Sequence, residues 1–443
     1  MRVVSSLALA AATLYAILVC AGDLREHLAL YLACHAVLLG LMLAAWRVVA
    51  AGGPAAFRAM FAAAVVFRLI AASASPSLSD DVYRYVWDGR VQTAGHHPYR
   101  AAPSDPMRAE LRDTDVYPKI NHADIPTIYP PLAEILFAAL SLAKLGVTGF
   151  KVALALLDVG VVWALLILLR TLGLPRDRVV LYAWNPLAVI EIAGSGHLEP
   201  LGVLLVVLAI AWITEGKATR AGAALGGAIQ AKLLPLLLVP GFARRMKTLP
   251  LLALVAVVAI TTAPYAVRGP WFGAGVLAYA NRWEHGAVFF AGVKRFFEWA
   301  DLAPHLKDAI TWAQGRWGTA ETGVWDALYR MVWPEGLARL TVALAAIGFA
   351  VVQSFRRGLD AAHEARLALG GAILLAPTLH PWYVLWVLPL AAAQGAGGWL
   401  LFGALVPLQY LAGEGEVPWA IRLAILLPPL AWMIRDALVR FRR

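Results

Sequence analysis

The sequence predicts an all-α protein that crosses a membrane many times. The chain has 443 residues, of which 61% are hydrophobic and only 15% are charged, and its mean hydropathy is +0.69. A soluble chain of this size could not bury so much apolar surface, because a single packed core stops growing at roughly 250–300 residues. Apolar stretches of about 20 residues recur along the chain, which is the length that a helix needs to span a bilayer.

Together these stretches predict roughly 12–14 transmembrane helices. In chain order they cover residues 3–21, 28–46, 57–74, 129–147, 150–169, 179–194, 198–214, 219–241, 248–267, 337–355, 366–379, 382–394, 397–412 and 419–434. The first stretch could also be a signal peptide cleaved near Ala21, but the many spans that follow favour a transmembrane helix. The stretch 219–241 contains Gly, Pro and Lys232, which favours a bent or re-entrant helix that lines a cavity. Residues 1–443 are therefore expected to form one integral-membrane domain.

Two long polar segments interrupt the apolar pattern. Residues 75–128 hold eight of the 28 acidic residues, six basic residues, three of the ten histidines and six prolines. Residues 268–336 carry seven of the 17 tryptophans, a composition that suits amphipathic helices at the membrane interface. If the N-terminus is cytoplasmic, the positive-inside rule places both segments on the extracytoplasmic face. Under this alternation loops 170–178 and 215–220 lie on the extracytoplasmic face, although they contain basic residues. The side of the membrane on which residues 195–200 lie therefore stays open.

The net charge of +10 does not indicate a nucleic-acid-binding protein. Basic residues gather in short loops beside the apolar stretches and at the C-terminus, as cytoplasmic loops do, and no basic stripe interleaved with aromatic residues appears. Cys20 and Cys34 both lie inside apolar stretches. Two cysteines are too few for a zinc site built from a cysteine cluster.

The first polar segment begins with an acidic pair in SLSDDVYRYVWDG, residues 77–89. Asp80 and Asp81 are expected at the membrane surface, where a carboxylate that borders a low-dielectric cavity gains the raised pKa of a general base. Repulsion between the two acids raises one pKa further. Alternatively, the pair caps a helix that starts at Val82, which is worth about 1 kcal/mol. The density of aromatic, Arg, His and Pro residues that follows exceeds what a connector needs and favours a binding site.

Basic, aromatic and acidic residues elsewhere are candidates for contact with a substrate, and basic ones suit a phosphate group. The candidates are Arg84, Asp88, Arg90, His97, Tyr129, His197, Glu199, Lys232, Arg282, His285 and His380. Lys232 lies inside apolar sequence, where a charge costs ~2.5–3.5 kcal/mol to insert and is functional by default, unless its side chain snorkels to the cytoplasm. His380 ends an apolar stretch at the expected membrane edge.

Some of these positions also have a structural interpretation. His197 and Glu199 either line a substrate groove or belong to a loop between short helices. The RWEHG stretch, residues 282–286, either covers the site or anchors an interfacial helix. Asp158 lies in the middle of an apolar stretch and is expected to pair with Arg68, because polar groups between membrane helices usually satisfy one another.

Seven motifs spread over the chain carry a further signal. They are SDDVYRYVWDGR, GHHPY, INH, IYPP, AWNPLAVIEIAGSGHLEP, AKLLP and PTLHPWYVLWVLPL. They resemble motifs of bacterial integral-membrane glycosyltransferases of the GT-C superfamily, above all the mannosyltransferases, including the glycosyltransferase family 87 type, that use polyprenyl-phosphate sugars. The acidic pair and the HPWY stretch are the most specific parts of the resemblance, which covers most of the chain.

The resemblance implies a GT-C-like helix bundle and an inverting glycosyltransferase of the inner (plasma) membrane. Such enzymes transfer a sugar, here favoured to be mannose, from a polyprenyl-phosphate donor to a hydroxyl of an extracytoplasmic glycolipid or glycan acceptor. An acidic residue in the first large outer loop, here residues 75–128, is the general base. That role falls on Asp80 or Asp81, and the family pattern does not distinguish the two. No cofactor is expected, although a magnesium or manganese ion at Asp80, Asp81 and Asp88 is the alternative.

Two other classes of protein compete with the enzyme. A transporter or flippase of a polyprenyl-linked substrate would use the acidic pair and Lys232 for ion coupling or binding. Coupling carboxylates are expected near the bilayer midplane and in related halves of the chain, whereas Asp80 and Asp81 are expected at the surface and in one half. A non-catalytic scaffold for envelope assembly would have little need for a Lys and a His embedded in the membrane.

Overall fold

The computed structural model describes residues 1–267, 273–318, 322–413 and 415–441, and every regular element in these ranges is helical. The α-helices are α1 (Arg2–Cys20), α2 (Leu28–Ala50), α3 (Pro54–Ala72), α4 (Asp81–Thr93), α5 (Pro131–Leu142), α6 (Val147–Thr171), α7 (Val180–Ala183), α8 (Pro186–Ala188), α9 (Glu199–Thr214), α10 (Ala218–Ala231), α11 (Val239–Arg245), α12 (Thr248–Ala266), α13 (Gly273–Arg282), α14 (Phe289–Ala300), α15 (Ala303–Trp317), α16 (Thr322–Met331), α17 (Pro334–Phe355), α18 (Ala361–Leu375), α19 (Leu388–Gln394), α20 (Gly397–Leu405) and α21 (Trp419–Phe441). Short 3-10 or π segments are η1 (Pro106–Leu111), η2 (Tyr117–Lys119), η3 (Arg176–Val179), η4 (Val189–Gly194), η5 (Leu234–Leu238), η6 (Pro381–Trp386) and η7 (Val406–Ala412).

Within the described ranges, six helices are long and apolar enough to cross a membrane, namely α1, α2, α3, α6, α12 and α17. Large apolar side chains such as Leu9, Ile260 and Leu344 point outward from them. In water these side chains would be an unfavourable surface, whereas lipid tails accommodate them. The predicted class, an all-α polytopic membrane protein, is confirmed.

The other predicted spans form shorter or interrupted helices. The stretch 129–147 yields only the 12 residues of α5. The stretch 219–241 breaks at Lys232, whose backbone is extended between α10 and η5, as predicted for a bent segment. A proline opens each of η5, α11, η6, α19 and η7, because its ring cannot continue a preceding helix but suits a first turn. The total of 12–14 spans stays a prediction.

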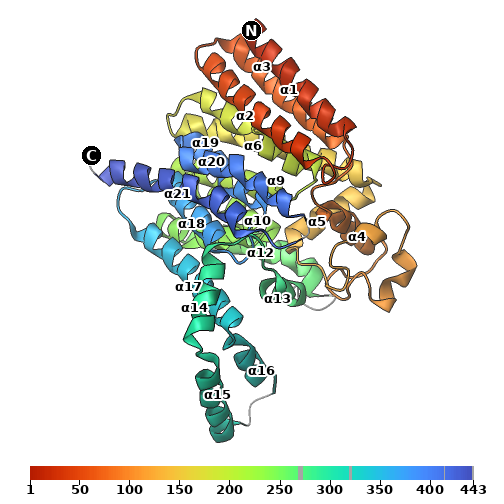
Figure 1. The fold of residues 1–443 in the computed structure, drawn as a ribbon, viewed down its shortest axis with the longest axis vertical. Helices are drawn as coiled ribbons and strands as arrows, with labels where there is room; N and C mark the ends of the chain where they lie inside the picture. Colours follow the sequence, from red (N-terminus) through yellow and green to blue (C-terminus); the bar gives the residue numbers. More distant parts are fainter. Residues whose placement is uncertain (268–272, 319–321, 414, 442–443) are drawn as a thin grey trace.

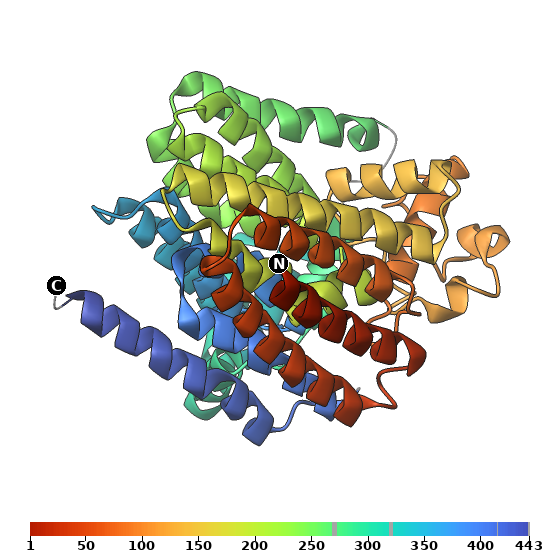
Figure 2. The same ribbon diagram turned by 90° about the horizontal axis from the view of Figure 1, so that it is seen from above.

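The helices form a bundle in which α6 packs on α9, α9 on α10, and α10 on α12. The N-terminal helices α1 to α3 lie together on one side, with α4 and α5 beside them (Figure 1). Seen from above, α12 and α21 lie at opposite edges of the bundle (Figure 2). The core between them contains the fully buried side chains of Trp87, Trp184 and Trp386.

The first polar segment contains a buried helix instead of an exposed loop. Along α4, the residues from Val82 to Gly89 are all buried. The helix packs on α5, where the ring of Tyr85 stacks on Phe137 with centroids 4.7 Å apart. This packing fixes the N-terminal end of α4, so the acidic pair is held rigidly at a helix start.

The second polar segment includes α13 to α16, of which α15 and α16 form a hairpin that projects from the bundle (Figure 1). Trp299, Trp312 and Trp317 are exposed there, which suits the predicted interfacial role. Contact with a membrane surface stays a prediction. Residues 268–272 and 319–321, which belong to the same predicted segment, lie outside the described residues.

Close contact between α10 and α12 depends on a glycine. A Cβ atom at Gly222 would lie 2.1 Å from the carbonyl oxygen of Pro250, which belongs to the backbone and cannot move aside without shifting α12. Small residues permit such close approach of membrane helices. We expect Gly222→Ala to destabilise the protein by about 1–3 kcal/mol through overpacking, seen as a lower midpoint of thermal unfolding in detergent.

The matched control is Gly348→Ala in α17, because a Cβ atom at Gly348 meets no atom within 4 Å. Its unfolding midpoint should stay the same or rise slightly, since Ala favours a helix over Gly by roughly 0.5–1 kcal/mol. Equal midpoints for the two variants would contradict the proposed contact.

Candidate active site

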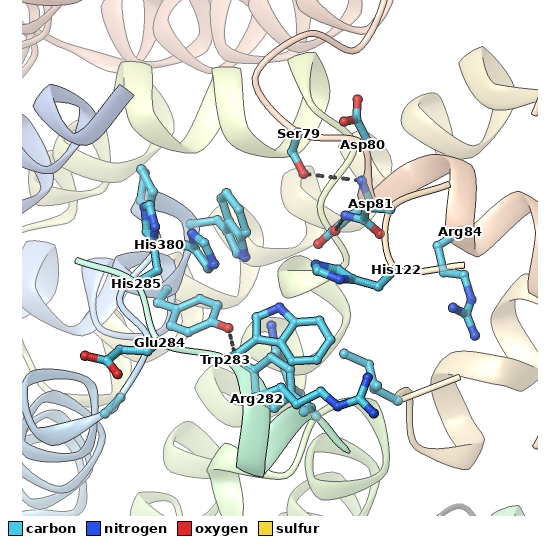
Figure 3. A pocket seen from close by; sticks show the side chains of 18 of the residues that line it. Ser79, Asp80, Asp81, Arg84, His122, Arg282, Trp283, Glu284, His285 and His380 are labelled. Atoms are coloured by element: carbon cyan, nitrogen blue, oxygen red, sulfur yellow. Dashed lines mark hydrogen bonds between the residues drawn. The ribbon is translucent and has the colours of Figure 1, made fainter. Parts of the chain in front are cut away.

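A cavity of about 1010 Å³ opens beside the N-terminal end of α4. Its walls come from α4, the break at Lys232, α13 and the segment that joins α18 to η6. Polar and aromatic residues on the walls include Arg25, Ser79, Asp80, Asp81, Arg84, Asn121, His122, Asp124, Tyr129, Lys232, Tyr279, Arg282, Trp283, Glu284, His285, His380, Trp382, Tyr383, Gln409 and Tyr410. Residues distant in the sequence thus share one chamber, part of which Figure 3 shows.

The two aspartates at the start of α4 have different surroundings. Asp80 accepts a hydrogen bond from Arg25 Nη2 at 2.9 Å, and its carboxylate turns away from the middle of the cavity (Figure 3). It occupies the N-cap position but makes no side-chain capping hydrogen bond. Asp81 turns inward (Figure 3) and accepts a hydrogen bond from Asn121 Nδ2 at 2.9 Å. Asp81 is therefore the carboxylate that faces the cavity.

The position of Asp81 also changes its acidity. Burial raises the pKa of the Asp81 carboxyl above its ordinary value, while the hydrogen bond from Asn121 and the positive charge of Lys232 act in the opposite direction. Desolvation disfavours the charged form of a carboxyl. A carboxylate with a raised pKa accepts a proton more readily than a solvent-exposed Asp.

Lys232 supplies a positive charge to the same cavity. The break between α10 and η5 turns its side chain inward, where the ammonium pairs with Glu199 and lies 4.9 Å from the ring centroid of Tyr383. The side chain of Lys232 is 31% exposed, but that of Glu199 only 1%. The ammonium can thus bind a second anion from the cavity side without losing Glu199.

His285 and His380 form another part of the wall. The N–H of His285 donates to the carbonyl of Pro377 at 3.2 Å, and the N–H of Leu379 donates to the carbonyl of His285 at 2.8 Å. This backbone pairing stacks the His285 and His380 rings at a centroid distance of 4.7 Å. Burial lowers the pKa of His380 well below its ordinary value, and the charges of His285 and Lys232 act in the same direction. Neutral imidazoles here can donate hydrogen bonds to an anion but add no charge.

His197 lies behind the cavity wall and is fully buried. Its ring stacks on the indole of Trp382 with centroids 3.9 Å apart, and its Nδ1 atom is 3.7 Å from Asp81 Oδ2. The GSGHLEP turn thus lies next to the acidic pair, which settles its position in the fold although not its side of the membrane.

Five of the predicted substrate-binding residues do not line the cavity. His197 and Glu199 are buried behind its wall, and the other three are paired elsewhere. Asp88 pairs with Arg84 one helical turn away, at 3.0 Å, Arg90 pairs with Asp113, and the His97 ring contacts the backbone carbonyl of Tyr265. Each has a partner that accounts for it structurally. Among the other predicted residues, Tyr129, Arg84 and Arg282 do reach the wall, although Arg84 is already engaged by Asp88.

Several cavity residues escaped the sequence analysis. Asn121 and His122 both lie in the INH motif, and the His122 ring packs on Trp283 with centroids 4.3 Å apart. Arg25 and Gln409 come from stretches with no recognisable motif. The INH motif was the available signal, because it is one of the seven motifs that carry the family resemblance.

The polar groups inside the bundle satisfy one another. Arg68 Nε donates to Asp158 Oδ2 at 2.7 Å, which confirms the predicted pair. Thr127 donates to Glu134 at 2.7 Å, and Glu134 does not line the cavity. No group of three His, Cys, Asp or Glu side chains in the described ranges has the arrangement of a metal site. Asp80 and Asp88 are instead paired with Arg25 and Arg84.

The fold and the cavity together define a polytopic membrane protein with a partly buried carboxylate in a cavity lined by basic and aromatic groups. Residues 3–248 match a family model described as "Alpha-(1->6)-mannopyranosyltransferase, N-terminal domain". The chain belongs to this family, named MptA_B. It is also 24% identical over 384 residues to a Mycolicibacterium smegmatis protein named "Probable alpha-(1->6)-mannopyranosyltransferase", an alignment that covers 77% of this chain and 66% of that relative's length. No solved structure gives a significant match.

Proposed function

We propose that the protein is an inverting mannosyltransferase of the inner (plasma) membrane. It takes a mannosyl unit from a polyprenyl-phosphate donor and transfers it to a hydroxyl of a glycolipid or glycan acceptor on the extracytoplasmic face. The observation that carries the proposal is the cavity in which Asp81 faces Lys232, His285 and His380. Membership of the mannopyranosyltransferase family supports the choice of sugar.

Asp81 acts as the general base in this reaction. Its carboxylate accepts the proton of the acceptor hydroxyl as the hydroxyl oxygen bonds to the anomeric carbon. The bond from that carbon to the phosphate oxygen breaks at the same time, and its electron pair stays on the phosphate. Attack from the side opposite the leaving group inverts the anomeric configuration. The raised pKa of Asp81 suits the proton transfer.

Lys232 stabilises the leaving phosphate. Charge-assisted hydrogen bonds from an ammonium to phosphate oxygens are stronger than neutral ones, and the negative charge on the phosphate increases as the sugar departs. His380 and His285 contribute hydrogen bonds from neutral rings. Glu199, which holds Lys232, keeps the ammonium in place before the donor arrives.

The test is a transfer assay with purified protein in lipid vesicles. Radiolabelled polyprenyl-phosphate mannose and a nucleoside-diphosphate mannose are supplied in parallel with a mannose-containing glycolipid acceptor. We expect label to move to the acceptor from the polyprenyl donor only, with inversion at the anomeric carbon. Thin-layer analysis of lipid-linked sugars that accumulate in a deletion strain identifies the donor independently.

Two outcomes would reject the proposed enzymatic function. One is the absence of transfer by folded protein when both the lipid donor and an acceptor glycan are present. The other is movement of the intact polyprenyl-linked sugar between the two leaflets of the vesicle without any change in its bonds, which would indicate a flippase.

A further inference from the structure

We propose that His197, Glu191 and Tyr410 form a buried proton relay behind Asp81. The inference rests on the proposed function and adds three positioning residues, of which His197 and Glu191 lie behind the cavity wall. Asp81 Oδ1 is already occupied by Asn121, so Oδ2 is the oxygen that faces His197 Nδ1, at 3.7 Å. The opposite ring nitrogen, Nε2, is 3.4 Å from Glu191 Oε2.

The relay consists of polar groups that have no other partner. Neither ring nitrogen of His197, nor Glu191 Oε2, makes a hydrogen bond of normal geometry within the described part of the chain, and both residues are fully buried. A buried polar group that lacks a hydrogen-bond partner destabilises the folded state. These atoms lie next to one another at spacings slightly longer than hydrogen bonds, which favours hydrogen bonds that form when the site is in use. Catalytic hydrogen bonds are often long before substrate binds.

Local backbone structure holds this line in place. Glu191 lies on η4, a π-helical turn (Val189–Gly194), and such turns are frequent at functional sites. The N–H of His197 donates to the carbonyl of Glu191 at 3.2 Å, which folds the His197 residue back over the turn. Gly196 has φ +86°, and a Cβ atom there would lie 2.9 Å from Cβ of Val82. The turn therefore fits directly against the first residues of α4.

The last group of the relay, Tyr410, lies at the cavity again. Tyr410 lines the cavity, and its hydroxyl donates to Glu191 Oε1 at 2.8 Å. Because Tyr410 is the donor in this bond, it occupies Glu191 Oε1 and leaves Oε2 as the oxygen that accepts the relayed proton. Both ends of the relay are open to the cavity, while its middle is sealed from water by the stacked indole of Trp382.

Two protons move in the relay, one onto His197 and one off it. Asp81 takes one proton from the acceptor hydroxyl and passes it from Oδ2 to His197 Nδ1. The imidazole, neutral at the start, simultaneously gives its Nε2 proton to Glu191 Oε2, so that Asp81 is again ionised and Glu191 is a carboxylic acid. A neutral ring is required, and burial together with the charges of Lys232 and His380 lowers the pKa of His197 well below its ordinary value. The relay stores the proton away from the newly formed glycosidic bond.

The experiment compares Glu191→Gln, His197→Gln and the double variant in the vesicle transfer assay. Glu191→Gln keeps the shape of the side chain, but its neutral amide cannot accept the relayed proton. We expect kcat to fall by about tenfold or more, with the KM for the donor unchanged, because these residues do not touch it. The double variant should be no slower than the slower single variant, since residues that act as a unit are not additive.

A pair of tyrosine variants provides the matched control. Tyr31 and Tyr410 are neighbours with ring centroids 6.0 Å apart, and the buried hydroxyl of Tyr31 has no hydrogen-bond partner in the described ranges. Tyr410→Phe should lower kcat, whereas Tyr31→Phe should leave it unchanged. Unfolding midpoints in detergent identify any variant whose loss of activity comes from unfolding.

The outcomes separate the relay from the proposed function. Wild-type kcat in Glu191→Gln, alongside an inactive Asp81→Asn variant, would overturn the relay and leave the mannosyltransferase intact. Losses in the double variant that equal the product of the single losses would also overturn it, since they indicate two independent structural effects. No transfer by the wild-type protein would overturn the proposed function and the relay together.

Discussion

Replacement of Asp81 by Asn is expected to lower kcat for mannosyl transfer by about 10²–10⁴-fold, the usual contribution of a general base. The amide preserves size and can still bond to Asn121, but it cannot accept the acceptor proton. Asp80→Asn should retain most of the activity, because the carboxylate of Asp80 is turned away from the middle of the cavity and paired with Arg25. Initial rates in vesicles that contain equal amounts of each variant provide the measurement.

The two aspartate variants serve as controls for each other. They differ by one position and carry the same chemical change, so a general effect of lost charge would lower both rates alike. Equal losses in both variants would contradict the assignment of the base to Asp81. Full activity in Asp81→Asn would remove the general base from the proposed mechanism altogether.

Removing one partner of the Arg68–Asp158 pair is expected to destabilise the protein by about 3–5 kcal/mol, because it leaves an uncompensated buried charge. Both side chains are buried between α3 and α6. Arg68 also donates to the carbonyls of Ala64 and Ala183, at 2.9 and 2.8 Å, and Asp158 accepts from Tyr182. Arg68→Met should therefore lower the midpoint of thermal unfolding in detergent sharply.

A double variant shows whether the effect comes from the charge. Arg68→Met combined with Asp158→Leu leaves no buried charge, so its midpoint should exceed that of Arg68→Met alone. Arg435→Met is the surface control, since Arg435 is 66% exposed in its pair with Asp436, and exposed pairs contribute about 0–1 kcal/mol. A wild-type midpoint for Arg68→Met would show that the buried pair has no stabilising role.

Much of the site could be predicted from the sequence because polar residues are rare in apolar surroundings. Lys232 and His380 are conspicuous for that reason, whereas the acidic pair stands out because it opens a polar segment dense in aromatic, Arg and His residues. The fold brings all four residues to one cavity. The sequence could not decide between Asp80 and Asp81, because the answer depends on the direction in which each side chain points. Neighbouring residues at a helix start differ by about 100° around the axis, so one faces Arg25 and the other faces the chamber.

Other errors have equally specific causes. Arg84 and Asp88 are four residues apart, a spacing at which opposite charges on a helix pair with each other, and the sequence analysis assigned both to the substrate. Arg90 and His97 found partners elsewhere in the fold, at residues that no local pattern connects to them. The shortened spans arise from prolines inside apolar stretches, which hydropathy counts as ordinary residues.

The backbone pairing between His285 and the Pro377–Leu379 segment has a mechanical consequence. The connection from α13 to α14 cannot swing outward without breaking these hydrogen bonds or pulling the His380 segment with it. A bulky lipid that enters by displacing α13 would therefore disassemble the stacked imidazoles, and they would re-form only after the connection had settled over the bound molecule. If the proposed lipid donor enters past α13, its entry and the re-formation of the stacked imidazoles would be coupled through these hydrogen bonds.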